Sequence, residues 1–161
     1  MRFAVPFSTA SLIAAVAMAG AAPAADAVYV NARFGYELSY PTDRLVAQPE
    51  ASNGDGRRFR ARDGSAEMAV WGGYNALEQS PAALARAVVD TDCGGRTPAL
   101  RVARADLVAV SCLKADGRIV YQKTLIHSDV LTTLRFDYPA AERATWDPVV
   151  KRVSASMKQA K

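Results

Sequence analysis

The chain has 161 residues and a formal net charge of +4, from 20 Lys and Arg against 16 Asp and Glu. Half of the residues are hydrophobic and 22% are charged, a composition that indicates a folded domain and excludes an intrinsically disordered chain. The small positive charge permits an acidic partner. It does not indicate a nucleic-acid-binding protein, in which many basic residues gather on one face.

The first 25 residues have the order of a secretory signal peptide: a basic residue, an apolar run and then small residues. Arg2 precedes the apolar run 12–18, and the segment AGAAPAADA follows it. The run is shorter than the ~20 residues that a transmembrane helix needs, so we expect cleavage within 24–27 and no membrane anchor. The sequence therefore predicts a periplasmic or secreted protein, with residues 26–161 as a single globular domain.

Two cysteines, Cys93 and Cys112, lie in this predicted domain. In an oxidising compartment an even number of cysteines indicates a disulfide. Such a bridge would stabilise the fold by about 3 kcal/mol, because it restricts the unfolded chain. The alternative is a catalytic thiol, which would need a histidine as base, and the only histidine is His127.

The first half of the domain contains strand and turn signals. Apolar and polar residues alternate over 29–41, which predicts one half-buried strand. The stretch 42–56 is rich in Pro, Gly and polar residues, which predicts a loop with at most a short strand at 45–46.

The Asp-Gly pair at 63–64 predicts a two-residue hairpin turn in which both positions have positive φ. The register that follows from this turn predicts two cross-strand pairs: Arg60 with Glu67, and Phe59 with Met68.

A helix is predicted at 80–89, because Ser80 is a favourable N-cap and Pro81 suits the first helical position. Residues 99–139 contain three or four β-rich strands joined by short turns, which makes neighbouring strands antiparallel. A second helix is predicted at the C-terminus from apolar residues at helical spacing, with Pro148 in its first turn. The fold class is therefore α+β: an antiparallel sheet of about six strands with a middle helix and a C-terminal helix packed on it.

Two segments resemble the PsbP-like family. FGYELSYP at 34–41 is similar to the family's opening strand, and FDYPAAERATWDPVVKRVSASMK at 136–158 is similar to its closing helix, with Ser156-Met157 where the family has Ser-Phe. The resemblance implies an α/β/α sandwich and a non-enzymatic binding or assembly factor. No binding residue of the family maps onto this chain, and the two cysteines depart from the plant members.

Two groups of residues are candidates for binding. Arg58, Arg60 and Arg62 alternate along one predicted strand, and guanidinium groups on one face suit a phosphate, a lipid head group or an acidic polysaccharide. A solvated edge strand whose charges discourage aggregation is the alternative. Trp71 and Tyr74 flank a Gly-Gly pair, which we expect to form a loop at the lip of a concave site. Core packing is the alternative for these aromatic residues.

The sequence contains no motif for catalysis, metal binding or cofactor binding. Ser128 and Asp129 follow His127, but neighbours in a turn point in different directions, so no catalytic residue is predicted. The sequence favours an exported, non-catalytic binding or accessory domain that engages a protein or an anionic envelope component, and no nucleic acid. A small secreted hydrolase and an inhibitor of an envelope-acting enzyme are the alternatives.

Overall fold

A computed structural model describes residues 25–160 of the chain. The expected signal peptide, residues 1–25, lies outside this range apart from its last residue. The described part centres on a seven-stranded antiparallel sheet of order β3-β4-β5-β9-β8-β7-β6, called here the central sheet. Its strands are β3 (Leu45–Glu50), β4 (Gly56–Ala61), β5 (Glu67–Tyr74), β6 (Leu100–Arg104), β7 (Leu107–Leu113), β8 (Arg118–His127) and β9 (Val130–Pro139).

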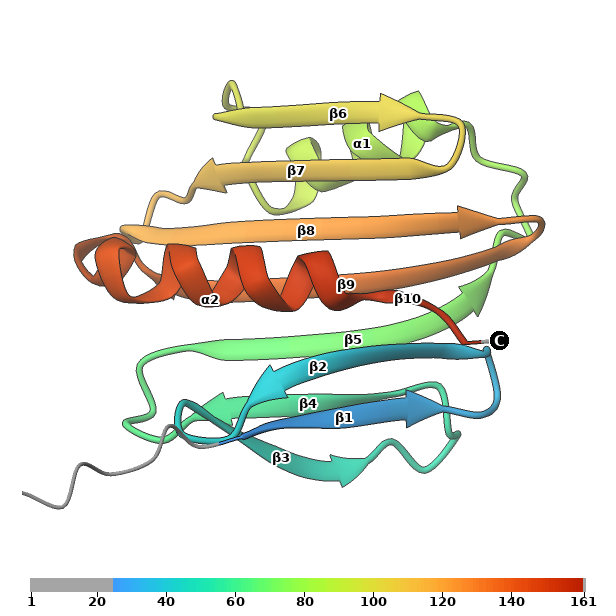
Figure 1. Cartoon of the computed structure of the whole chain (residues 1–161). Coiled ribbons are helices and arrows are strands. Elements are labelled where there is room, and N and C mark those ends of the chain that lie inside the picture. The colour runs from blue at the N-terminus through green and yellow to red at the C-terminus, as the bar shows by residue number, and fades with distance from the viewer. Residues whose placement is uncertain (1–24, 161) are drawn as a thin grey trace, which may run out of the picture.

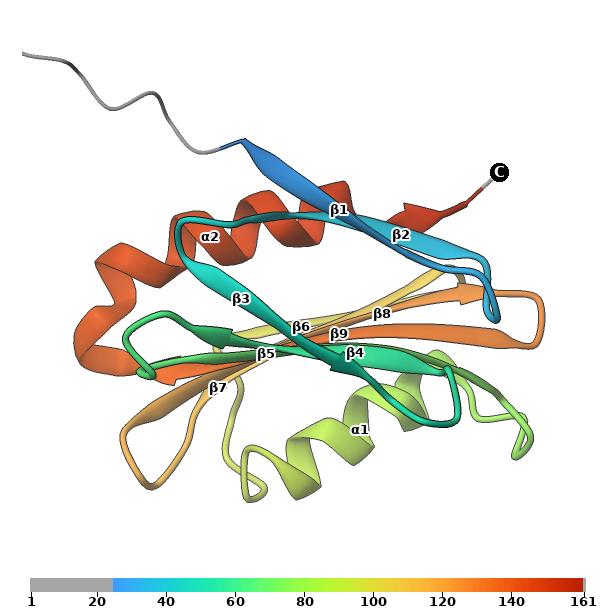
Figure 2. The same ribbon diagram turned by 90° about the horizontal axis from the view of Figure 1, so that it is seen from below.

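The remaining elements form a layer on each face of the central sheet. A three-stranded sheet of order β1-β2-β10 lies on one face together with the C-terminal helix, and the middle helix lies on the other (Figures 1 and 2). These elements are β1 (Asp26–Asn31), β2 (Tyr36–Pro41), α1 (Pro81–Thr91), the 3-10 helix η1 (Ala140–Glu142), α2 (Arg143–Ser156) and β10 (Lys158–Gln159). No helix within residues 25–160 is long and apolar enough to cross a membrane.

The prediction of a middle helix and a C-terminal helix on an antiparallel sheet is confirmed, but the expected six strands are too few. The predicted strand 29–41 is a hairpin of β1 and β2, because a turn that contains Gly35 at φ 61° interrupts the alternation. The predicted loop 42–56 contains β3. Its Pro49 is tolerated because β3 is an edge strand with an irregular register between Ala47 and Glu50.

The predicted register of the β4–β5 hairpin is confirmed, since Arg60 pairs with Glu67 and Phe59 pairs with Met68. The predicted turn is wrong. Only Gly64 of the Asp-Gly pair has a positive φ, of 75°, and its N–H donates to the carbonyl of residue 61 at 2.9 Å. The hairpin is therefore closed by a wider turn that keeps the same register.

Both helices begin with the features that their sequences indicate. Ser80 Oγ accepts a hydrogen bond from the backbone N–H of Ala83 at 3.2 Å, and Pro81 is the first residue of α1. Pro148 is the sixth residue of α2 and not in its first turn, because α2 already begins at Arg143 after η1. The expectation for Pro148 is therefore corrected.

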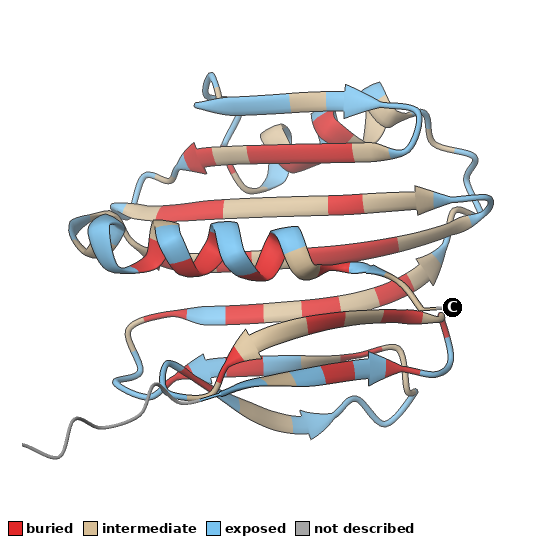
Figure 3. Ribbon diagram, in the orientation of Figure 1, coloured by how far each residue is buried: buried red, intermediate tan, exposed pale blue. Residues whose placement is uncertain are grey.

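The main core lies between the central sheet and the layer of α2, β1 and β2. The buried stripe of α2 alternates with exposed residues along its outer side (Figure 3). The residues from α2 are Trp146, Val149, Val150 and Val153, and those from the central sheet include Phe59, Met68, Leu134 and Phe136. This core covers most of one face of β4, β5 and β9, whereas their opposite face lies outside it.

Candidate binding site

The face of the central sheet that α1 covers, called here the α1 face, is only partly covered. Ala85 and Val88 of α1 pack against Val108, Val110 and Val120 of β7 and β8 in a second, smaller core. Figure 1 shows α1 behind β6 and β7, and Figure 2 shows it as the layer opposite α2. The α1 face of β4, β5 and β9 therefore remains open.

Cross-strand register defines three rows of side chains on the α1 face, since directly opposite residues in a sheet point to the same side. From β7 to β4 the rows are Cys112–Val120–Asp137–Glu67–Arg60, Val110–Gln122–Arg135–Ala69–Arg58 and Val108–Thr124–Thr133–Trp71–Gly56. Each row begins with buried residues beneath α1. The first two rows end with exposed charged residues on β4, which marks the limit of the covered region.

A groove of about 730 Å³ lies on the open part of the α1 face. Its volume falls within the range of about 300–1,000 Å³ that is usual for small-molecule sites. The groove is lined by Arg58, Glu67, Ala69, Trp71, Arg135 and Asp137 of the central sheet and by Gln48, Pro49, Ser52, Asn53 and Asp55 at its rim. It combines an aromatic side chain with both cationic and anionic groups.

The two arginines of the second row differ in their partners. Arg135 Nη2 lies 2.5 Å from Asp92 Oδ1, at the end of α1. Arg58 is exposed and forms no ion pair with any residue between 25 and 160. The groove therefore holds one cation that is fixed by a carboxylate and one that is available to a ligand.

The first row is held by ion pairs. Asp137 accepts a hydrogen bond from Lys114 Nζ at 3.2 Å and another from Arg118 Nε. Lys114 Nζ also lies 3.0 Å from Asp116 Oδ2, and this contact raises the pKa of Lys114 and lowers the pKa of Asp116. The contact therefore favours the charged forms of Lys114 and Asp116, and the ion pairs of Lys114 and Arg118 hold Asp137 at the end of the groove.

The structure separates the sequence-predicted arginines. Arg58 lies in the groove, and Arg60 lies in the next row, 3.7 Å from Glu67. Arg62 lies beyond β4, and its Nε donates a hydrogen bond to the carbonyl of Thr42 at 2.9 Å. The expectation of three arginines along one strand is therefore corrected: β4 carries two of them, because it ends at residue 61.

The predicted aromatic pair is also separated. The expected loop at Trp71 and Tyr74 is the end of β5, so alternation places these residues on opposite faces. Trp71 lines the groove, whereas Tyr74 is 63% exposed and packs edge-on against Phe34, with ring centroids 5.4 Å apart. The prediction of a Trp71–Tyr74 lip is wrong.

Sequence reasoning missed Arg135, Ala69 and Asp92. Arg135 reaches the groove because β9 pairs with β5, although more than fifty residues separate these strands along the chain. The alternation within 130–139 was a signal that Arg135 and Asp137 share a face. No local pattern in the sequence indicates which strand lies beside them.

The predicted disulfide between Cys93 and Cys112 is confirmed, with the two Cα atoms 5.8 Å apart. Both residues are buried, and neither is a free thiol, which excludes a catalytic thiol at these positions. The bridge ties the chain just after α1 to β7. It therefore fixes Asp92, the neighbour of Cys93, close to Arg135 in the groove.

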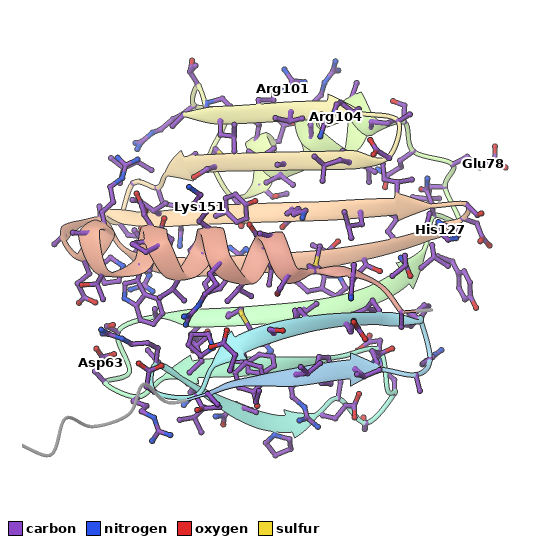
Figure 4. All side chains as sticks on the ribbon, in the orientation of Figure 1. Asp63, Glu78, Arg101, Arg104, His127 and Lys151 are labelled. Atoms are coloured by element: carbon purple, nitrogen blue, oxygen red, sulfur yellow. A yellow bond between two sulfur atoms is a disulfide. The ribbon has the colours of Figure 1, made fainter. Side chains whose placement is uncertain are left out.

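His127 lies at the exposed end of β8 (Figure 4). Within residues 25–160 no side-chain hydrogen bond joins it to Ser128 or Asp129, which form the adjacent turn. In the same described part, no group of three or more His, Cys, Asp or Glu residues is placed to hold a metal ion.

The arrangement of these elements matches a known protein. Cyanobacterial PsbP (CyanoP) from Synechocystis sp. PCC 6803 superposes with a TM-score of 0.61 at 15% sequence identity, over 89% of this chain and 98% of that chain. The chain has a PsbP-like fold. Because so few residues are identical, the PsbP-like fold is all that this likeness establishes.

Two further solved structures are similar to this PsbP-like domain. A protein from Bacteroides thetaiotaomicron gives a TM-score of 0.52 at 9% identity, over 83% of this chain and 48% of that chain. LpqN, involved in cell envelope biogenesis of Mycobacterium tuberculosis, gives a TM-score of 0.36 at 15% identity, over 88% of this chain and 87% of that chain. This TM-score is too low to carry an argument. No family model matches the chain, and no curated protein matches its sequence.

Proposed function

We propose that this protein is an exported, non-catalytic binding domain that engages an envelope component through the groove on the α1 face. The observation that carries the proposal is Arg58, a cation without an ion-pair partner among residues 25–160, beside Trp71 in a groove of ligand size. Recognition sites on folded proteins commonly combine charged and aromatic side chains.

Two features support export. Residues 1–25 have the pattern of a secretory signal. Disulfides such as Cys93–Cys112 persist mainly in oxidising compartments outside the cytoplasm. An envelope component is therefore the class of partner that the domain meets.

The groove supports binding over chemistry. Two charged residues that line the groove are held in ion pairs: Arg135 pairs with Asp92, and Asp137 pairs with Lys114 and Arg118. Charged groups whose positions are fixed in this way are suited to orienting a ligand.

Capture of envelope material on the immobilised purified protein tests the proposed function. We expect the wild-type protein to retain a specific component from an envelope extract, and Arg58→Ala or Trp71→Ala to lose it. Arg101→Ala is the matched control. Arg101 is an exposed arginine on β6, which is the edge strand at the far end of the central sheet from β4 (Figure 4). His127→Ala should also retain the component.

The outcome that would contradict the proposed function is retention that survives both groove substitutions and fails in Arg101→Ala. Loss of a hydrolytic activity in His127→Ala, with retention unaffected by the groove substitutions, would instead support the alternative of a small hydrolase.

A further inference from the structure

We propose that the groove binds an acidic sugar unit, with its acidic group above Ala69 and its ring against Trp71. This inference rests on the proposed function and names the class of ligand for the same groove. It follows from the positions of Arg58 and Arg135 on either side of Ala69, from the side chains along β5, and from the polar groups at the rim.

The acidic group is placed by the second row. Arg58 of β4 and Arg135 of β9 are the two direct neighbours of Ala69 of β5 on this face. Adjacent strands lie about 4.8 Å apart, so the two arginine backbones are about 10 Å apart. Ala69 between them carries only a methyl group, which leaves room for an anion that both guanidinium groups can reach.

The charges in this row favour an anion over a cation. Asp92 already compensates Arg135, with 2.5 Å between their nearest atoms, while no carboxylate among the described residues compensates Arg58. A ligand that brings one negative charge would complete the pairing of this row. A cationic ligand would meet the free guanidinium of Arg58 and be repelled.

The ring is placed by the third row. Trp71 lies two residues beyond Ala69 on the same side of β5, and its neighbour on β4 is Gly56. A Cβ at Gly56 would overlap the backbone of Val70 and Trp71, so β4 carries no side chain beside the indole. Trp71 is half-buried and lines the groove, which leaves part of its apolar ring open beside the anion position. The face of a sugar ring carries C–H groups that pack on such a surface.

The polar groups of the groove distinguish a hydroxylated ring from a plain aromatic acid. Carboxylates and amides line the groove around Trp71 and Ala69; they are Gln48, Asn53, Asp55 and Glu67. Each of these groups has a partner within the protein. An aromatic acid would cover their remaining donor and acceptor positions without replacing the hydrogen bonds to water, which is costly. Sugar hydroxyls can both donate to the carboxylates and accept from the amides.

A titration followed by amide and side-chain NMR signals of the purified protein tests this inference. The probes are glucuronate, which joins a ring to a carboxylate, glucose 6-phosphate, which joins it to a phosphate, and three controls: glucose, acetate and inorganic phosphate. We expect saturable shifts at Ala69, Trp71 and Arg135 with one or both of the acidic sugars, and weaker binding of every control. Which acidic sugar binds tighter identifies the acidic group.

Two substitutions test the assigned positions. Arg58→Gln should weaken binding of the acidic sugar about tenfold, the typical loss for one charge-assisted hydrogen bond. It should leave binding of glucose unchanged. Arg101→Gln on β6 should leave both unchanged. Because Arg58 is exposed, the variant is expected to fold, and an unchanged thermal unfolding midpoint verifies this.

Three results would overturn the inference: no saturable shift with either acidic sugar, equal affinity for acetate or inorganic phosphate alone, and equal affinity for glucose. If one of these results occurs while the capture experiment still depends on Arg58 and Trp71, the ligand class is wrong and the proposed function stands. If capture is also independent of both residues, the proposed function is wrong too.

Discussion

Among single residues, Gly72 shows how a missing side chain lets another segment pack closely against β5. A Cβ at Gly72 would overlap the ring of Phe34, whereas a Cβ at the adjacent Gly73 would meet no atom within 4 Å. Phe34 is buried and supports the exposed ring of Tyr74. The strand therefore passes close to the β1–β2 turn on one face and carries the groove on the other.

We predict that Gly72→Ala lowers the free energy of unfolding by about 1–3 kcal/mol, the usual range for overpacking. The matched substitution Gly73→Ala should be neutral or slightly stabilising, because its methyl group enters open space and alanine loses less entropy on folding than glycine. Denaturant unfolding of both variants measures the difference. Equal stability of the two variants would show that Phe34 does not need the space at Gly72.

Among secondary-structure elements, α1 determines where the groove ends. Its apolar side covers β7 and β8, and its last turn brings Asp92 to Arg135. The disulfide holds this end of the helix to β7. A helix a few turns long on a seven-stranded sheet leaves the far strands open, so the extent of α1 is one reason why a groove exists.

We predict that replacing both cysteines by alanine lowers the free energy of unfolding by about 3 kcal/mol, because the closed loop spans 19 residues and its removal frees the unfolded chain. The NMR signals of Arg135 should shift as well, since Asp92 is no longer held in place. Wild-type protein in a strong reductant should behave in the same way. Unchanged Arg135 signals in an otherwise folded variant would contradict the link between the disulfide and the groove.

The elements that could be predicted from the sequence are those with local signals. Ser80 and Pro81 mark the start of α1, and the Asp-Gly pair at 63–64 fixes the β4–β5 register within a few residues. The sequence predicts one strand in place of the β1–β2 hairpin, because its alternation continues across the turn. Only a short strand at 45–46 is predicted within β3, because its proline and polar residues are also typical of loops. Pairing with β4 shows the full edge strand.

Only part of the candidate site could be predicted, because some of its residues come together only through pairing of distant strands. Arg58 and Trp71 lie on neighbouring strands of one hairpin, so their residue types could be recognised as binding candidates. Arg135 comes from a strand much later in the chain and lies beside Ala69 only through the β5–β9 pairing. Long-range pairing of this kind depends on the packing of the whole sheet, which local patterns do not contain.

At the scale of the whole molecule, the two faces of the central sheet have different roles. One face is sealed by α2 and the three-stranded sheet over the main core, and the other is sealed by α1 only over β7 and β8. The open part carries charged rows and an aromatic side chain where a core would carry aliphatic ones. The central claim is therefore that this open half of the α1 face is the surface by which the protein binds.

Site-specific photo-crosslinking in the cells that produce the protein tests this claim most directly. A benzophenone amino acid is introduced in place of Glu67 at the groove, and in separate variants in place of Arg101 on β6 and of Tyr74 on the opposite face of β5. We predict that irradiation gives a specific adduct at position 67 and none at positions 101 or 74. Adducts at position 101 or 74, with none at position 67, would contradict the claim.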